Sequence, residues 1–455
     1  MAIDLSFQSV PLPEDLQKLK FYGDFSGAEK LITFLLNKKI PEALRRRLEI
    51  ERAVLECMSL DEYPYTFEEA SAMMQERIRD YSEGELTGLK ETGLADWIFI
   101  DGKVRFQRRF FENLTKTRPE YESRLLKREP QEITARKQQV LNDNVRLMKE
   151  KGGRTVEITL RTSIKIKKEF EEIGKEVTVH LPLPRECRQV SGFSLLKTTP
   201  EGASIAPPEA PQRTACFKTI LKGDDRFSLE YRFLNHLDYI NPDPGQAVQT
   251  GVSFDLGEQL PHIQFTPYLQ FLLKEIVGDE KNPVNTARRI YDFITTTVDY
   301  SYMRAYFTID NISQYAAVNL KGDCGVQAIL FITLCRMAGI PARWQSGLFT
   351  AEYYTGCHDW AEYYIEPWGW IFADLSFGGS SWRAGETERW NYYFSNLDVF
   401  RMPANGSMQD DFTPPKKQLR SDPVDNQRGE IEYGDRGLPM ASLETEQVLL
   451  SIRDV

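Results

Sequence analysis

The chain has 455 residues and a formal net charge of −10 at pH 7. A chain of this length exceeds what one hydrophobic core supports, so we expect several domains. The negative charge and the lack of a dense Lys/Arg block with interleaved aromatic residues argue against a nucleic-acid partner. No segment approaches the ~20 apolar residues of a membrane span, so no membrane partner is expected.

The cysteines and the first residues bear on the cellular compartment. The six cysteines are too few for a disulfide framework in a chain of this size, and none forms a CxxC pair. We interpret Cys57, Cys187 and Cys216 as reduced side chains, which favours a reducing compartment. Residues 1–5 lack a basic segment and an apolar run, so no signal peptide is expected. Together these features predict a cytoplasmic location.

The first part of the chain shows the spacing of apolar residues that is typical of helices. We expect a helical N-terminal region over residues 1–150, with patterns at 16–21, 28–37, 41–57, 67–81 and 119–151. These patterns do not repeat with a constant period, so a helical repeat array is not predicted.

The pattern changes to strict alternation near residue 153, which is typical of strands. Strands are expected at 156–166, 177–181, 216–221 and 227–233. Separated by turns, they predict an antiparallel β-sandwich over residues 153–262, apart from the catalytic core. At the other end of the chain, residues 401–455 are rich in turn residues and hold one short possible strand, 430–433. We expect this C-terminal extension to pack on the core.

A cysteine between two small residues stands at the start of an apolar helical run. Cys324 follows Gly322 and Asp323 and precedes Gly325, and the run 326–338 comes next. Gly339 and Pro341 end that run. A thiol in the first turn of a helix meets unpaired N–H groups and the helix dipole, which predicts a lowered thiol pKa. The alternative is a small buried cysteine in a core helix.

A histidine and an aspartate follow on two predicted strands. The aromatic runs 360–365 and 370–374 flank a turn signal at 367–369, which predicts a β-hairpin. If Asp374 lies opposite Trp360, His358 is its diagonal neighbour on the same face of the sheet. A two- or four-residue loop would put the two side chains on opposite faces. A Cys-His-Asp triad therefore requires this register.

These residues resemble the core of the transglutaminase-like superfamily, and specifically its bacterial-type multidomain members. The resemblance covers roughly residues 265–400 and rests on separate blocks in order: 322–325, 330–331, 334–343, 358–362, 369–370 and Asp374. The chain departs from the family at Asp359, where a small residue is usual, and at Cys357.

The resemblance implies a papain-like α+β core in which Cys324 attacks an amide carbonyl. His358 would act as base and then as acid, and Asp374 would orient it. Members of the family include cross-linking transglutaminases, peptidases and peptide:N-glycanases, and some have lost catalysis. The predicted fold is thus α+β and multidomain: a helical region (1–150), a β-sandwich (153–262), a papain-like transglutaminase core (263–400) and the extension (401–455).

Other site residues are chosen by their chemistry. The backbone N–H of Cys324 is the natural first oxyanion donor. For the second donor we choose Gln314, with Tyr300 and Tyr302 as alternatives. Aromatic residues are dense around the hairpin, and most of them are expected to pack in the core.

From these aromatic residues we select Trp360 and Trp382 as candidates for lining a substrate cleft. No metal or cofactor is predicted. A zinc site formed by Cys324, Cys357, His358 and Asp374 is disfavoured. Cys357 and His358 are adjacent on a strand, so their side chains point to opposite faces of the sheet. No EF-hand-like run supports calcium.

The sequence is therefore interpreted as that of a thiol enzyme whose partner is a peptide or protein substrate. Hydrolysis is preferred over amine transfer, because water needs no second binding site. Two alternatives are a protein-glutamine transglutaminase and a non-catalytic protein-binding scaffold that retains the triad. The sequence does not indicate an oligomeric state.

Overall fold

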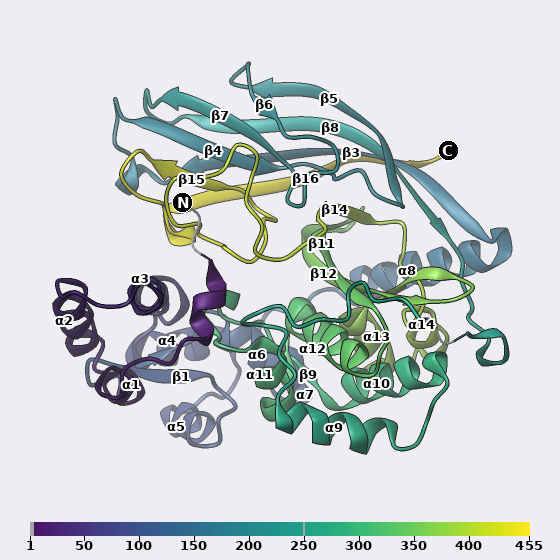
Figure 1. Ribbon diagram of the computed structural model, residues 1–455, viewed down its shortest axis with the longest axis horizontal. Coiled ribbons are helices and arrows are strands. Elements are labelled where there is room, and N and C mark those ends of the chain that lie inside the picture. Colours follow the sequence, from purple (N-terminus) through teal and green to yellow (C-terminus); the bar gives the residue numbers. More distant parts are fainter. Residues whose placement is uncertain (1–3, 249–250) are drawn as a thin grey trace.

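The computed structural model describes residues 4–248 and 251–455, and Figure 1 shows its elements. Helices and antiparallel sheets combine in an α+β multidomain arrangement, which confirms the predicted class. Residues 1–3, on which the expectation about a signal peptide partly rests, lie outside the described residues. Within the described ranges, no helix combines the length and apolar character that crossing a membrane requires.

The N-terminal region is mainly helical, as its spacing predicts. Side-chain caps define several of its helix starts: Asp24 accepts from the Gly27 N–H, and Thr66 and Glu69 form a capping box. The sequence patterns missed α5, α6 and the hairpin of β1 and β2. The elements are η1 (Leu5–Ser9), α1 (Glu14–Phe21), α2 (Phe25–Leu36), α3 (Glu42–Cys57), η2 (Met58–Glu62), α4 (Phe67–Arg77), α5 (Glu83–Glu91), β1 (Trp97–Ile100), β2 (Lys103–Phe106), α6 (Phe110–Thr117), α7 (Pro119–Glu122) and α8 (Gln131–Lys151).

Two antiparallel four-stranded sheets form the sandwich at the top of Figure 1. Their orders are β16-β3-β8-β5 and β15-β4-β7-β6. Alternation places Val156, Ile158 and Leu160 of β3 in the fully buried interior, as period two requires. The elements are β3 (Gly153–Ile166), η3 (Lys168–Phe170), β4 (Glu176–Pro182), β5 (Val190–Thr199), β6 (Ser204–Ile205), β7 (Thr214–Ile220), β8 (Arg226–Asp238) and η4 (Pro244–Gln246).

The C-terminal extension does more than pack on the core. β15 (Glu430–Tyr433) pairs with β4, and β16 (Leu443–Asp454), which follows η6 (Met440–Ser442), pairs with β3 along most of its length. The chain thus returns to complete both sheets of the sandwich, as the yellow strands of Figure 1 show.

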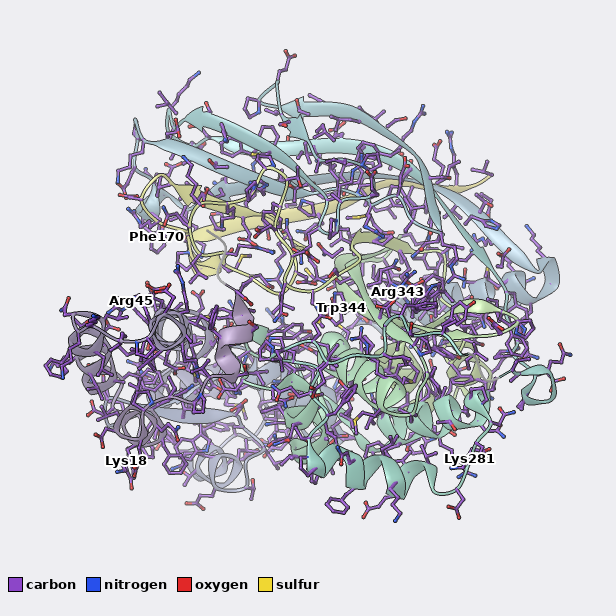
Figure 2. The ribbon with its side chains drawn as sticks, viewed as in Figure 1. Lys18, Arg45, Phe170, Lys281, Arg343 and Trp344 are labelled. Carbon is purple, nitrogen blue, oxygen red and sulfur yellow. The ribbon has the colours of Figure 1, made fainter. Side chains whose placement is uncertain are left out.

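The core is a four-stranded sheet of order β13-β12-β11-β14 with α12 packed on one face. Arg343 and Trp344, labelled in Figure 2, are adjacent on β11. Trp344 is buried in the cluster that includes α12, whereas Arg343 pairs with Glu362 of β12. The elements are α9 (Pro267–Val277), α10 (Pro283–Thr297), β9 (Asp299–Tyr300), η5 (Tyr306–Thr308), α11 (Ile312–Asn319), β10 (Lys321–Gly322), α12 (Cys324–Met337), β11 (Ala342–Ala351), β12 (Tyr354–Ile365), β13 (Gly369–Ala373), α13 (Leu375–Arg383), α14 (Thr387–Tyr392) and β14 (Arg401–Asn405).

The hairpin of β12 and β13 has the register that the sequence requires. Ile365 pairs with Gly369, and Ala361 pairs with Ala373. Continued by one step, this register puts Asp374 opposite Trp360. The register prediction is confirmed.

The sandwich packs directly on the core sheet. Leu348 and Trp360 of the core sheet share one hydrophobic cluster with Val156 and Phe233 of the sandwich. The other face of the core sheet joins α12 and the first helices of the chain in a second cluster. The predicted division of the chain into four parts, 1–150, 153–262, 263–400 and 401–455, stays a proposal.

Gly347 of β11 is the partner of His358 in the sheet and has no room for a side chain. A Cβ there would lie 1.9 Å from the carbonyl oxygen of Met402 on β14. We expect Gly347→Ala to force β11 and β14 apart and to lower the free energy of unfolding by about 1–3 kcal/mol or more. Thermal unfolding followed by circular dichroism measures this.

The matched control is Gly88→Ala in α5, where no atom of the described residues lies within 4 Å of an added Cβ. That change should stabilise the helix by about 0.5–1 kcal/mol. Equal unfolding temperatures for Gly347→Ala and the wild type would contradict the packing described for β11 and β14.

Candidate active site

Cys324 begins α12, and the residue before it caps the helix. The carboxylate of Asp323 accepts from the Val326 N–H at 3.3 Å. The N–H groups of Cys324 and Gly325 lie in the first turn, where no intrahelical acceptor exists. The cysteine is half-buried and lines a cavity of about 220 Å³. The thiol is thus at a helix start beside a space that a small group can enter.

His358 and Asp374 meet as the register requires. His358 Nε2 lies 2.7 Å from Asp374 Oδ2, and the carboxylate is fully buried. Because an ionised carboxylate only accepts, Nε2 must carry the ring proton in the neutral imidazole. Nδ1 is then the nitrogen that can take a proton.

Asp374 has further partners in the buried interior. Its Oδ1 accepts from the Phe377 N–H at 2.9 Å and from Ser376 Oγ at 3.2 Å. Arg401 of β14 forms an ion pair with it, with 2.8 Å between Nη1 and Oδ2, and Arg401 also binds Asp398. The side chains of Asp374, Arg401 and Asp398 are all fully buried.

The charges around Asp374 fix its ionisation. Burial alone raises the pKa of a carboxyl group, but His358 and then Arg401 lower the pKa of Asp374 to about 2. Burial lowers the pKa of His358 below its usual value, Asp374 opposes that change and Arg401 adds to it. The pair at neutral pH is therefore a neutral imidazole beside an ionised carboxylate.

Trp360 supports the histidine ring and does not line a cleft. It is fully buried, its Nε1 donates to Gln345 Oε1 at 2.7 Å, and its ring stacks with the His358 ring at 6.0 Å. The prediction of Trp360 as a cleft residue is wrong, because this side chain is fully buried in the cluster that the core sheet shares with the sandwich.

The thiol is hydrogen-bonded to Asp359. Cys324 Sγ donates to Asp359 Oδ2 at 3.3 Å, and among the described residues no hydrogen bond joins it to His358. Tyr306 OH lies 3.2 Å from the same oxygen and donates to Asp323 Oδ1 at 2.7 Å. A Cβ on Gly325 would lie 2.7 Å from Asp359 Oδ2, so this approach needs glycine. The predicted approach of the thiol to His358 stays a prediction.

The electrostatics of the thiol are opposite to those expected from the helix start. Burial raises the pKa of Cys324 well above its usual value, and Asp359 and Asp323 raise it further. The prediction of a lowered thiol pKa is therefore wrong for this resting arrangement, because burial of the thiol, together with the carboxyl groups of Asp359 and Asp323, outweighs the helix dipole. Burial, and then Asp323, raises the pKa of Asp359 to about 7.

The C-terminal extension covers β12 beside the thiol. Gln427 Nε2 donates to the His358 carbonyl at 3.1 Å and to Asp359 Oδ1 at 2.5 Å. Arg428 Nε donates to Cys357 Sγ at 3.2 Å. The two positions at which the sequence departs from the family that it resembles, 357 and 359, are thus both contacted by the extension.

Two other predicted residues lie elsewhere. Tyr300 and Tyr302 line the cavity with Cys324, but Gln314 does not. Gln314 is in the first turn of α11, where its N–H donates to Asn311 Oδ1. Trp382 is 45% exposed on α13 and does not line this cavity either. The structure supports neither the oxyanion role of Gln314 nor the cleft role of Trp382.

The sequence analysis missed the groups that hold Asp374 and that contact the segments around Cys324 and His358. These are Arg401, Asp398, Tyr306 and Gln427. Asp398 and Arg401 have the i,i+3 spacing of a local ion pair, but nothing local shows that Asp374 joins them. In the described parts of the chain, no three His, Cys, Asp or Glu side chains are arranged as metal ligands.

The family model of the transglutaminase-like superfamily matches residues 270–375, which confirms the resemblance for a transglutaminase-like domain there. A candidate cysteine protease from Cytophaga hutchinsonii is 17% identical, with 66% of this chain and 91% of that chain covered and a TM-score of 0.42. The periplasmic domain of TgpA from Pseudomonas aeruginosa is 13% identical, with 54% and 95% covered and a TM-score of 0.28. The comparison with curated proteins found no match.

Asp359 should control the reactivity of Cys324. The carboxylate opposes thiolate formation only while it is ionised, so its effect grows as pH rises through about 7. We expect Asp359→Asn to raise the alkylation rate of Cys324 at about pH 8 by about threefold to tenfold, and to change it less at about pH 6. Peptide mapping after timed iodoacetamide labelling measures the rate at each pH.

The control is Asp411→Asn, which removes an exposed carboxylate outside the cavity and should leave both rates unchanged. The account of Asp359 fails if Asp359→Asn alters labelling equally at both pH values or slows it at the higher one.

Arg401 should be essential for folding. Arg401→Met leaves Asp374 and Asp398 buried without their cation, which should cost about 3–5 kcal/mol of unfolding free energy. Arg453→Met removes a 66%-exposed arginine and should change stability by less than about 0.5 kcal/mol. Urea unfolding of both variants checks this, and similar values for the two would refute the role given to Arg401.

Proposed function

We propose that Cys324, His358 and Asp374 form the catalytic triad of a thiol enzyme that cleaves a peptide or protein amide, with water as the preferred acceptor. The observation that carries the proposal is the 2.7 Å bond between His358 and a fully buried, ionised Asp374. That bond leaves Nδ1 of the imidazole as the base. The cysteine beside this strand segment begins a helix, where a nucleophile is accessible and N–H groups are free.

Acylation begins with a move of the thiol. Cys324 Sγ leaves Asp359 and turns towards His358 Nδ1, which accepts its proton. The sulfur then attacks the carbonyl carbon, and the C–S bond forms as the carbonyl oxygen becomes an oxyanion. The backbone N–H of Cys324 donates to this oxyanion, and Tyr300 and Tyr302 in the cavity are the candidates for a second donor. When the C–N bond breaks, His358 gives its proton to the leaving amine.

Deacylation reverses the roles. Water attacks the thioester carbonyl while His358 Nδ1 takes one of its protons. The C–S bond breaks, the product leaves as a free acid, and the proton on His358 returns to the sulfur. Throughout, Asp374 stays ionised and stabilises the imidazolium.

Two alternatives use the same residues. If an amine replaces water in deacylation, the enzyme is a protein-glutamine transglutaminase. If no acyl-enzyme forms, the chain is a protein-binding scaffold that retains the triad. We also propose a cytoplasmic location, which the six free cysteines support.

Cys324→Ala should abolish turnover without unfolding the protein. Incubation of the wild type with a protein digest in ¹⁸O-water, followed by mass spectrometry, should give new carboxyl termini that carry ¹⁸O. Cys324→Ala should reduce their formation by about 10⁶-fold, and Asp374→Asn by about 10⁴-fold.

The matched control is Cys335→Ala, a buried cysteine on the same helix outside the cavity, which should keep its activity. Incorporation of an added primary amine in preference to ¹⁸O would replace hydrolase with transglutaminase. Equal products from Cys324→Ala and the wild type would refute the triad.

A further inference from the structure

The cavity beside Cys324 has walls from outside the catalytic core. One wall is η2, a π-helical turn that directly follows α3 and supplies Asp61 and Glu62. Another is the segment 421–430 of the C-terminal extension. π-helical turns are rare and are frequent at functional sites. The N-terminal helices and the extension thus join around the candidate nucleophile.

The carboxyl groups on η2 are buried and incompletely bonded. Asp61 and Glu62 are 6% and 3% exposed. Among the described residues, Asp61 Oδ1 and Glu62 Oε2 have no hydrogen-bond partner. The other oxygen of Glu62 accepts from Arg108 Nη2 at 3.3 Å. Buried carboxylate oxygens without donors are costly, so a donor in the cavity would relieve that cost.

The C-terminal extension carries a buried hydrogen-bond donor that has no acceptor among the described residues. Asn426 is 2% exposed, and its Oδ1 accepts from the Gly429 N–H at 2.9 Å. Its Nδ2 has no partner among the described residues. The cavity therefore offers free acceptors on one wall and a free amide donor on another, which fits an ammonium group close to a carbonyl.

Carboxyl groups outnumber guanidinium groups around the cavity. Seven carboxyl groups line it against four guanidinium groups. Each guanidinium group has a partner: Arg108 pairs with Glu62, Arg109 stacks on Tyr302, Arg304 lies over the Tyr315 ring and Arg428 contacts Cys357. Among the described residues, Nε of Arg304 has no hydrogen-bond partner. Burial raises the pKa of Asp61 and of Glu62, and it raises the pKa of Asp422 to about 6. A cation bound among these carboxyl groups would lower their pKa values and stabilise the ionised forms, so the cavity suits a cation.

We propose that this cavity binds a primary ammonium group, with Asp61 and Glu62 as its acceptors and Asn426 as the donor to a neighbouring carbonyl. The inference rests on the proposed function for the source of that group. It is either the free amino terminus of the peptide being cleaved or the amine that accepts the acyl group. The volume of about 220 Å³ is below the ~300–1,000 Å³ of sites for drug-sized ligands, so a small group fits.

The direct test uses thiol reagents that differ in charge. Cys324 of the full chain is treated with 2-aminoethyl, methyl or 2-sulfonatoethyl methanethiosulfonate. In each reaction the sulfur forms a mixed disulfide and methanesulfinate leaves. Rates are read by peptide mapping and divided by those of 2-mercaptoethanol. We expect the cationic reagent to react at least about tenfold faster than the anionic one.

Asp359 also attracts cations, so the variants decide the outcome. The double variant Asp61→Asn/Glu62→Gln should reduce the preference for the cation by about threefold or more. Glu76→Gln, an exposed change on α4 of the same region, should keep it. A second measurement avoids the thiol: ethylammonium chloride should raise the unfolding temperature of Cys324→Ala above that in sodium chloride of equal ionic strength. The double variant should lose this rise.

Substrates identify the source of the ammonium group. A preference for a peptide with a free amino terminus over its acetylated form, lost in the double variant, identifies the amino terminus. Incorporation of added amine with a raised KM in the double variant identifies the acceptor amine. A cationic preference without any amide turnover supports the subsite and rejects the proposed function. If the double variant changes neither the reagent preference nor the ethylammonium effect, the subsite is refuted.

Discussion

The buried hydrogen bond between His358 and Asp374 is the interaction on which the rest of the site depends. A carboxylate without solvent is costly unless it is paired and hydrogen-bonded. Here Arg401, the Phe377 N–H and the imidazole meet that requirement together. The pairing holds only in one register of the β12–β13 hairpin, since a slip of one residue would turn one of the two side chains to the other face. The hairpin register, the position of β14 and the orientation of His358 are therefore linked.

Two aspartates near the histidine differ in ionisation because their neighbours differ. Asp374 has Arg401 beside it, and its pKa falls to about 2. Asp359 has neutral donors and a second carboxyl group, Asp323, and its pKa rises to about 7. Asp374, beside His358, thus stays ionised, while Asp359, beside Cys324, is partly protonated near neutral pH. Different environments can shift the pKa values of two like groups in opposite directions, so that one site holds an ionised and a protonated carboxyl group together. The resting thiol is kept protonated until it leaves Asp359.

The local features of the sequence predicted much of the fold and the pairing of His358 with Asp374. Helical spacing, alternation and turn residues act over a few positions, so α12, the strands of the sandwich and the β12–β13 register were predictable. The contacts that depend on distant segments were not. Arg401 reaches Asp374 only because β14 pairs with β11. The sign of the predicted Cys324 pKa shift was wrong because the burial of the thiol and the approach of Asp359 from β12 both depend on distant segments. Gln314 was chosen because its side-chain amide can donate a hydrogen bond, but that property does not indicate where α11 places the side chain.

The most direct test of the triad is to trap the acyl-enzyme. The wild type, Cys324→Ala and His358→Ala are mixed with an activated peptide ester, quenched in acid at set times and weighed intact by mass spectrometry. The account predicts one acyl adduct on Cys324 in the wild type, none in Cys324→Ala, and slower formation by about 10²-fold or more in His358→Ala. An adduct on another cysteine, or equal rates with and without His358, would contradict it.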